Sequence, residues 1–221
     1  MGFGFTRAGD HVAWMILTIG RLSMNKFWGE TERLRTPLCT STLLMTEAGL
    51  AIVDPSIHVP DMPALLRDQA GIQPEDVRHV MLTHFHGDHR YGLEAFPHAT
   101  WLMAEPELAY WRARAGADEQ RLLDRIVPAG ETPLPGCRLI PTPGHTPGHH
   151  SIAFPWRGRR VVVAGDAVMT EDFYRAREGY HNSADVAQAR DTVDRLARDA
   201  DVIIPGHGNI FAVDWAQGAA L

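Results

Sequence analysis

The segment Thr83-His84-Phe85-His86-Gly87-Asp88-His89 places three histidines and one aspartate within six residues, directly after an apolar run. On an extended backbone, His84 and His86 project to the same side, while Asp88 and His89 fall on the turn that follows. One segment can therefore face two metal ions. Imidazole and carboxylate ligands suit zinc, iron or manganese, and the lack of cysteine in this segment removes the case for a closed thiolate site.

Three later segments repeat the same arrangement, with a histidine or an aspartate beside glycine after a predicted strand. They are Thr142-Pro143-Gly144-His145, Ala164-Gly165-Asp166 and Pro205-Gly206-His207. Glycine lets the backbone turn sharply and come close to an ion, and proline stiffens the approach. Seven ligand-type residues in four ordered motifs indicate a metal site rather than isolated surface or core histidines.

The motif order His-x-His-x-Asp-His, Pro-Gly-His, Gly-Asp and Pro-Gly-His resembles the metallo-β-lactamase superfamily of hydrolases, from Asp54 to His207. The resemblance implies two metal ions that share a bridging carboxylate. The implied ligands are His84, His86 and His145 for the first ion, Asp88, His89 and His207 for the second, and Asp166 for both. An aspartate that ends the preceding strand of the family is present as Asp54.

Two divalent metal ions, zinc first and iron or manganese as alternatives, would supply the nucleophile. Metal charge lowers the pKa of a bound water to roughly 7, and a bridging hydroxide can then attack the carbon of a substrate carbonyl group or the phosphorus of a phosphoryl group. Asp88 is the predicted catalytic carboxylate, because it lies near the attacking water and can orient it or carry its proton to the leaving group.

Length and composition predict one α/β domain over residues 1–221, with 45% hydrophobic and 22% charged residues and no linker or repeat. The predicted strands cover 11–19, 38–46, 49–54, 78–83, 99–103, 137–142, 150–154, 160–164 and 201–204. Helices are expected over 61–70 and 184–199, after Gly87, and between Pro106 and Ile126. Two groups of strands with helices outside them fit the αββα four-layer sandwich that the resemblance implies.

The true β-lactamases of the family usually carry cysteine or serine at the bridging position. Asp166 therefore argues against a dedicated β-lactamase. A formal charge of −6 gives no general phosphate-binding surface, so a nucleic-acid partner is not expected. The resemblance favours a hydrolase of a small ester or lactone, similar to the acyl-homoserine lactonases. Those enzymes place a tyrosine three residues after the bridging aspartate, where this chain has Met169.

Two alternatives remain open. A persulfide dioxygenase resembles the same fold but binds one iron and consumes oxygen. A minimal phosphodiesterase or nuclease of the same fold would use the binuclear site on a phosphodiester.

Two segments are predicted to form the walls of the substrate pocket. The segment after Asp166 contributes Tyr174 and His181 as candidate substrate contacts, with Tyr180 as a further candidate. The other wall is the stretch from Met24 to Leu38, which carries Phe27 and Trp28. Aromatic side chains at a rim favour an apolar part of the substrate.

The two cysteines, Cys39 and Cys137, are expected to be buried thiols rather than a disulfide, which fits a reducing, cytoplasmic compartment. The apolar run from Val12 to Ile19 is too short to span a bilayer and is expected to be the first strand, so no membrane association is predicted. The resemblance includes dimeric proteins, and a homodimer is one expected assembly.

Overall fold

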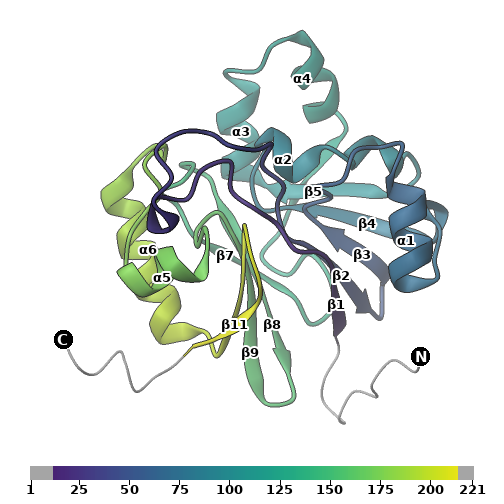
Figure 1. Cartoon of the computed structure of the whole chain (residues 1–221). Helices are drawn as coiled ribbons and strands as arrows, with labels where there is room; N and C mark the ends of the chain where they lie inside the picture. The colour runs from purple at the N-terminus through teal and green to yellow at the C-terminus, as the bar shows by residue number, and fades with distance from the viewer. Residues whose placement is uncertain (1–11, 214–221) are drawn as a thin grey trace.

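Two β-sheets lie face to face in the computed structural model, which describes residues 12–213. Figure 1 shows the two sheets in the middle of the molecule, between α5 and α6 on the left and α1 on the right. The six-stranded sheet has the order β1 (Ala13–Thr18), β2 (Ser41–Thr46), β3 (Gly49–Val53), β4 (Val77–Leu82), β5 (Thr100–Ala104) and β6 (Ile126–Ala129). The five-stranded sheet has the order β11 (Phe211–Ala212), β10 (Val202–Pro205), β9 (Arg159–Gly165), β8 (His150–Trp156) and β7 (Arg138–Pro141).

Strand direction decides where the loops of each sheet meet. β3 to β6 run parallel to one another, and β9 runs parallel to β10. β8 is antiparallel to both β7 and β9, so β7 has the same direction as β9 and β10. The carboxyl ends of β7, β9 and β10 therefore lie at one edge of the five-stranded sheet.

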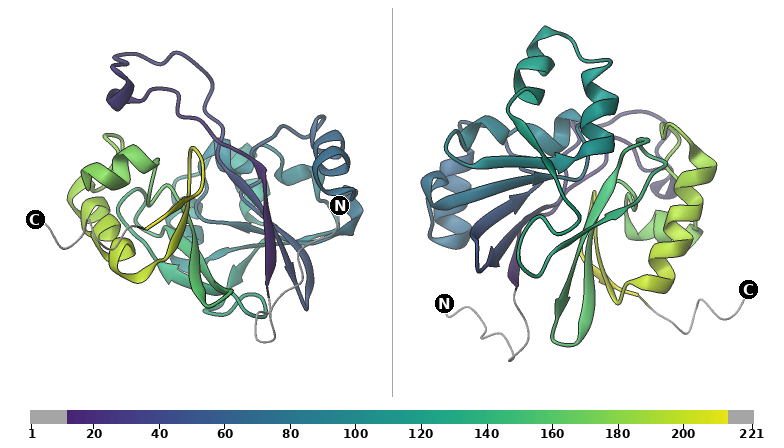
Figure 2. Two further views of the ribbon diagram at one scale, coloured as in Figure 1. Left: turned by 60° about the horizontal axis from the view of Figure 1, so that its bottom comes forward. Right: turned by 180° about the vertical axis from the view of Figure 1, so that it is seen from behind.

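Helices cover the outer faces of both sheets (Figures 1 and 2). The connections between strands of the first sheet contain α1 (Met62–Ala70), α2 (Gly87–Arg90), α3 (Glu105–Arg112) and α4 (Ala117–Leu123). The connection between β9 and β10 of the second sheet contains α5 (Glu171–Ala176) and α6 (Val186–Asp199). Single 3₁₀ turns occur at Lys26–Trp28, Pro74–Asp76 and Leu93–Ala95. The N-terminus of α6 is capped by Asp185, whose side chain accepts a hydrogen bond from the amide of Gln188.

Three apolar clusters separate the four layers. Alternation along β9 shows the arrangement, because Val161 and Val163 face the other sheet while Val162 packs toward α6. On the opposite side of the molecule, Ile52 of β3 belongs to the cluster that lies between the first sheet and its helices. This layering confirms the predicted αββα sandwich.

The predicted strands are all present within a few residues of their predicted bounds, and position 11 of the first one lies outside the described residues. Strands β6 and β11 were not predicted. β6 contains Pro128 and an exposed Val127, a composition that sequence reading assigns to a loop and that is tolerated here because β6 is an edge strand. The helix expected after Gly87 is a single turn, and part of the segment after Asp166 is the helix α5.

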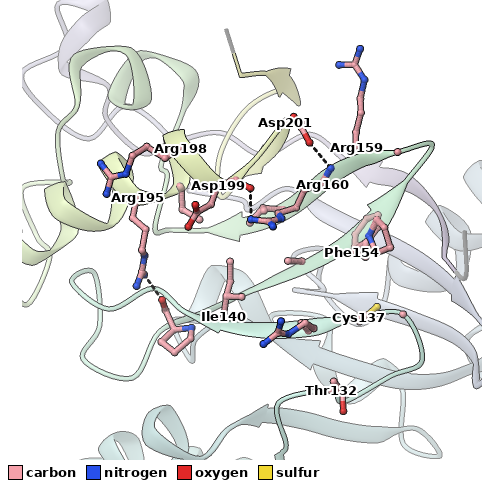
Figure 3. Close-up of a pocket in the computed structure, with 18 residues that line it drawn as sticks. Thr132, Cys137, Ile140, Phe154, Arg159, Arg160, Arg195, Arg198, Asp199 and Asp201 are labelled. Carbon is pink, nitrogen blue, oxygen red and sulfur yellow. Dashed lines mark hydrogen bonds between the residues drawn. The ribbon is translucent and has the colours of Figure 1, made fainter. Parts of the chain in front are cut away.

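A groove of about 1070 Å³ lies on the outer face of the second sheet beside α6 (Figure 3). Arg160 and Arg195 border it, and each donates a hydrogen bond to a backbone carbonyl, of Asp199 and Pro141 respectively. None of the seven candidate metal ligands lines this groove. Its arginine side chains fasten α6 to the sheet.

Cys39 and Cys137 are both buried and unpaired with each other, as predicted. Within residues 12–213, none of the helices has the length and apolar character needed to cross a membrane.

Candidate metal centre

The seven candidate ligands come from loops that follow four strands of both sheets. The segment His84–His89 follows β4, whereas His145, Asp166 and His207 follow β7, β9 and β10. Five of the seven side chains are buried, namely His84, His89, His145, Asp166 and His207, whereas His86 and Asp88 are partly exposed. The fold thus brings together all the ligands that the sequence predicted.

Glycines let these loops approach one another. A Cβ atom on Gly206 would lie 2.1 Å from Oδ1 of Asp166, so only glycine fits beside that carboxylate. Gly144 has a φ of 133° and its backbone touches Ala189 at the start of α6, where a Cβ would meet the amide nitrogen at 2.3 Å. Glycine is therefore required by close contact at both of these positions.

The first ligand group consists of His84, His86 and His145 around one oxygen of Asp166. Nδ1 of His86 lies 2.9 Å from Nε2 of His84 and 2.9 Å from Nε2 of His145. Oδ2 of Asp166 lies 3.1 Å from Nε2 of His145 and 3.8 Å from Nε2 of His84. These four ligand atoms lie within 4.8 Å of one another.

The second ligand group faces the other oxygen of the same carboxylate. Oδ1 of Asp166 lies 3.1 Å from Nε2 of His89 and 3.3 Å from Nε2 of His207. Oδ2 of Asp88 lies 3.6 Å from Nε2 of His207. The two oxygens of Asp166 are thus divided between two ligand groups.

Two buried polar atoms in this cluster lack a hydrogen bond among the described residues: Nε2 of His89 and Oδ1 of Asp166. A buried polar atom without a partner costs roughly 1–3 kcal/mol. Imidazole nitrogens and carboxylate oxygens are common ligands of divalent zinc, iron and manganese. The donor set and the unsatisfied atoms therefore fit a pair of divalent metal ions.

The outward-facing nitrogens of these imidazoles are held by other groups. Nδ1 of His89 lies 2.9 Å from Oδ2 of Asp54, and Nδ1 of His207 lies 2.8 Å from the carbonyl oxygen of Leu38. Nδ1 of His84 lies 3.1 Å from the hydroxyl of Thr83. Such contacts fix the ring orientation, so that Nε2 points toward the centre of the cluster.

The environment sets the charge of the ligands. Burial lowers the pKa of His84 well below its ordinary value and that of His86 to about 4, so both rings are neutral at neutral pH. Burial opposes the charge of Asp166, but the imidazoles of His89 and His207 outweigh it and hold its pKa well below the usual range. The carboxylate of Asp166 is therefore anionic.

Asp54 has a larger part in the site than the sequence indicated. Its oxygens accept hydrogen bonds from the amide and the hydroxyl of Thr83 at 2.8 and 2.7 Å, in addition to the contact with His89. Its φ of 52° lies in the left-handed region, which is strained for a residue other than glycine. Beside it, the thiol of Cys39 donates to the carbonyl of Asp54 at 3.2 Å, and burial raises the pKa of that thiol to about 11. Sequence reading missed Cys39 here, because nothing in its spacing marks it.

The predicted substrate contacts have separate positions. Tyr174 is buried in the outer layer, where its ring packs on Phe211 with 5.0 Å between centroids, so the structure does not bring it to the ligands. His181 is exposed, and its ring lies 4.2 Å from that of Tyr180. Burial raises the pKa of Tyr180, and the charges of Asp166 and Asp88 add smaller increases.

The loop between β1 and β2 reaches across to α5 (Figure 1). The hydroxyl of Tyr180 donates to the carbonyl of Met24 at 3.1 Å, and the side chain of Asn25 donates to Asp172 at 3.1 Å. Trp28, in the middle of this loop, is 63% exposed. Hydrogen bonds thus join this loop to the segment after Asp166.

Comparison with known proteins identifies the family of this chain. The family model described as the Metallo-beta-lactamase superfamily matches residues 35–207. Metallo-beta-lactamase domain-containing protein 1 of Xenopus laevis is 36% identical over 149 residues, which cover 65% of this chain and 59% of that protein. An N-acyl homoserine lactonase of a Bacillus species is 27% identical over 126 residues, which cover 54% of this chain and 47% of that protein.

A crystal structure of an N-acyl homoserine lactone hydrolase with its product N-hexanoyl-L-homoserine at the catalytic metal centre has a TM-score of 0.67 at 20% identity. The match covers 90% of this chain and 93% of the other. The likeness shows a shared fold. The matches span about half of the length of the two curated relatives. By the family match over residues 35–207, this chain belongs to the metallo-beta-lactamase superfamily.

Proposed function

We propose that this chain is a binuclear metal-dependent hydrolase that acts on a small ester or lactone. The observation that carries the proposal is the division of the Asp166 oxygens between two ligand groups. In this proposal, His84, His86 and His145 hold one divalent ion, and Asp88, His89 and His207 hold the other. Zinc is the first candidate, with iron or manganese as alternatives.

The bound ions would supply a water of lowered pKa and a Lewis acid for the substrate oxygen. The chain's own residues would hold and orient the reactants. Asp88 has the more accessible carboxylate, with its side chain 16% exposed against 4% for Asp166. Asp88 is therefore placed to orient the attacking water and to carry its proton to the leaving group.

The ester or lactone class is supported by the likeness to N-acyl homoserine lactonase and by the character of the loop between β1 and β2. Phe27, Trp28 and Leu34 of this loop are exposed apolar residues. Exposed apolar groups beside a polar site suit a substrate with an apolar acyl part. A small molecule is thus the proposed substrate. A single domain over residues 1–221, a cytoplasmic location and a homodimer belong to the same proposal.

The proposal is tested by elemental analysis of the chain purified without added metal, together with turnover of lactone, aryl ester, phosphodiester and β-lactam substrates. We expect about two divalent ions per chain and hydrolysis of the lactone or the ester. Asp88→Ala and His145→Ala should each abolish hydrolysis and lower the metal content. Exposed residues of the same types, changed as Asp118→Ala and His98→Ala, are the matched controls and should leave both unchanged.

Several results would contradict the proposal. A single iron per chain with oxygen uptake would assign the chain to mononuclear iron chemistry of the dioxygenase type. Turnover of the phosphodiester alone would replace the ester or lactone by a phosphodiester. Full activity of either ligand variant would exclude the binuclear mechanism.

A further inference from the structure

A buried carboxylate lies behind the first ligand group, on a helix that contributes no candidate ligand. Glu107 is the third residue of α3 and is fully buried. We propose that Glu107 is a positioning residue that sets the geometry of the first ligand group and not that of the second. This inference rests on the proposed metal-dependent hydrolase.

Three hydrogen bonds connect Glu107 to the loops that carry these ligands. Oε1 accepts from the amide of Phe85 at 3.2 Å and from the indole Nε1 of Trp111 at 2.7 Å. Oε2 accepts from the hydroxyl of Thr146 at 2.7 Å. An amide and an indole can only donate, so Oε1 of Glu107 accepts both of these hydrogen bonds.

Each partner of Glu107 is next to a ligand of the first group. Phe85 stands between His84 and His86 in the chain, and Thr146 follows His145. The ring of Trp111 packs edge-on against the ring of His86, with 5.5 Å between centroids. One carboxylate therefore restrains two loops that come from different sheets and a ring that packs against His86.

The backbone around Glu107 shows the same convergence. A Cβ atom on Gly148 would lie 2.2 Å from the amide nitrogen of Glu107, so the loop that carries His145 packs directly on the start of α3. Hydrogen bonds to a buried carboxylate that carries a charge are stronger than neutral ones, because solvent does not screen the attraction in the interior, where the dielectric is low. Replacing this carboxylate should loosen both loops together.

The second ligand group is held by other residues. Asp54 orients His89, and the carbonyl of Leu38 orients His207. None of the hydrogen bonds recorded for Glu107 in the described part of the chain reaches Asp88, His89 or His207. The inference therefore predicts a selective effect on one of the two proposed metal sites.

The test compares Glu107→Gln with Asp54→Asn in the full chain. Metal-free protein is titrated with zinc, and the two binding affinities are measured by calorimetry or by competition with a chelator. Glu107→Gln should weaken one site by about 10- to 100-fold, the effect usual for groups that orient metal ligands, and leave the other within about twofold. Asp54→Asn should weaken the opposite site.

Double variants identify which site is affected. If Glu107 acts on the first group, Glu107→Gln should add little to the metal loss of His145→Ala, because both changes affect one site. Combined with Asp88→Ala, which disables the other group, it should remove the remaining tightly bound ion. Activity of Glu107→Gln should recover at high zinc concentration, a recovery that a merely misfolded protein would not show.

Thr146→Val and Thr146→Ser provide a pair of milder variants in case Glu107→Gln does not fold. Valine has nearly the shape of threonine and removes one donor to Glu107, so it should weaken the same site by severalfold. Serine keeps the hydroxyl and should restore the affinity.

Two unchanged zinc affinities in Glu107→Gln and in Thr146→Val would overturn the inference, and so would equal weakening of both sites. These results differ from a failure of the proposed function, in which the unaltered chain itself would bind fewer than two ions or hydrolyse none of the substrates.

Discussion

The two ligand groups share Asp166 but differ in the charge around them. His84 and His86 are kept neutral by burial, and Asp166 is the only carboxylate among the ligands they face. His207 also has Asp88 nearby, and carboxylates raise its pKa although burial opposes this. The first group thus offers preorganised neutral nitrogens, whereas the second offers a higher negative charge.

The difference shows that one shared carboxylate can face two ligand groups that are held in place by different residues. The first group is positioned through Glu107, which touches the loops and not the ligands. The second is positioned through Asp54, which contacts the His89 ring directly. Variants that affect one group, the other, or both will show how independent the two sites are.

Asp166→Asn should have the largest effect, because it removes the charge that both groups share. We expect kcat/KM to fall by at least a thousandfold, which corresponds to about 4 kcal/mol in the barrier. Metal content should fall in both sites. The exposed variant Asp118→Asn serves as control in the same kinetic and elemental measurements, and loss of only one ion would show that Asp166 does not bridge the groups.

Asp54→Asn should affect the second group more than the first, because Asp54 contacts the His89 ring directly and reaches His84 only through Thr83. An asparagine amide cannot replace the carboxylate that orients Nδ1 of His89, so zinc affinity at that group should fall by about 10- to 100-fold. Calorimetric titration of metal-free protein measures the change. Equal weakening of both sites would mean that the two groups are not independent.

The pH dependence of the metal-free protein should have opposite signs in the two groups. The pKa of His86 is lowered from 6.5 to about 4, so the unfolded chain gains a proton first as the pH falls, and stability is lost between those values. At pH 5 this loss is about 2 kcal/mol, and His86→Asn should remove it.

The pKa of His207 is raised in the folded state, so its contribution to stability is present below 6.5 and is lost as the pH rises through the folded value. His207→Asn should therefore cost more stability at pH 6 than at pH 9. Urea unfolding across this pH range measures both variants, and the same sign for the two would refute the contrast between the groups.

Tyr180→Phe should have the smallest effect, because it changes a contact of the loop between β1 and β2 and none of the candidate ligands. Removing the hydroxyl frees the carbonyl of Met24 and loosens the loop that carries Trp28. KM for an ester or lactone should rise severalfold, with little change in metal content. Tyr174→Phe is the matched control and should leave turnover unchanged, since that ring packs in the outer layer. An equal effect of both variants would show that Tyr180 has no special place.

Much of the site could be predicted because its information is local. The spacing of His84, His86, Asp88 and His89, and the glycines before the later ligands, follow from backbone geometry over a few residues. The helix over residues 184–199 was readable for the same reason, and the structure has α6 at Val186–Asp199, with Asp185 as a cap that was not predicted. Motif order then indicated the family and with it the layers.

Tyr174 and Tyr180 show where the sequence was insufficient. Both are aromatic and polar and lie in one segment, but the helix α5 turns Tyr174 toward Phe211, while Tyr180, beyond the helix, donates to the carbonyl of Met24 in the loop between β1 and β2. The direction of a side chain on a short helix depends on what that helix packs against. Sequence reading had no contact information with which to choose between them.

The sequence by itself determined which residue types form the candidate centre, because ligand chemistry and local spacing are properties of short segments. Only the tertiary structure decided that the oxygens of Asp166 divide between two groups and that Glu107 is buried behind one of them. Glu107 stands in an ordinary acidic stretch near Glu105, with no distinguishing pattern. Its role depends on contacts with residues 22 and 39 positions away, and packing alone brings these together.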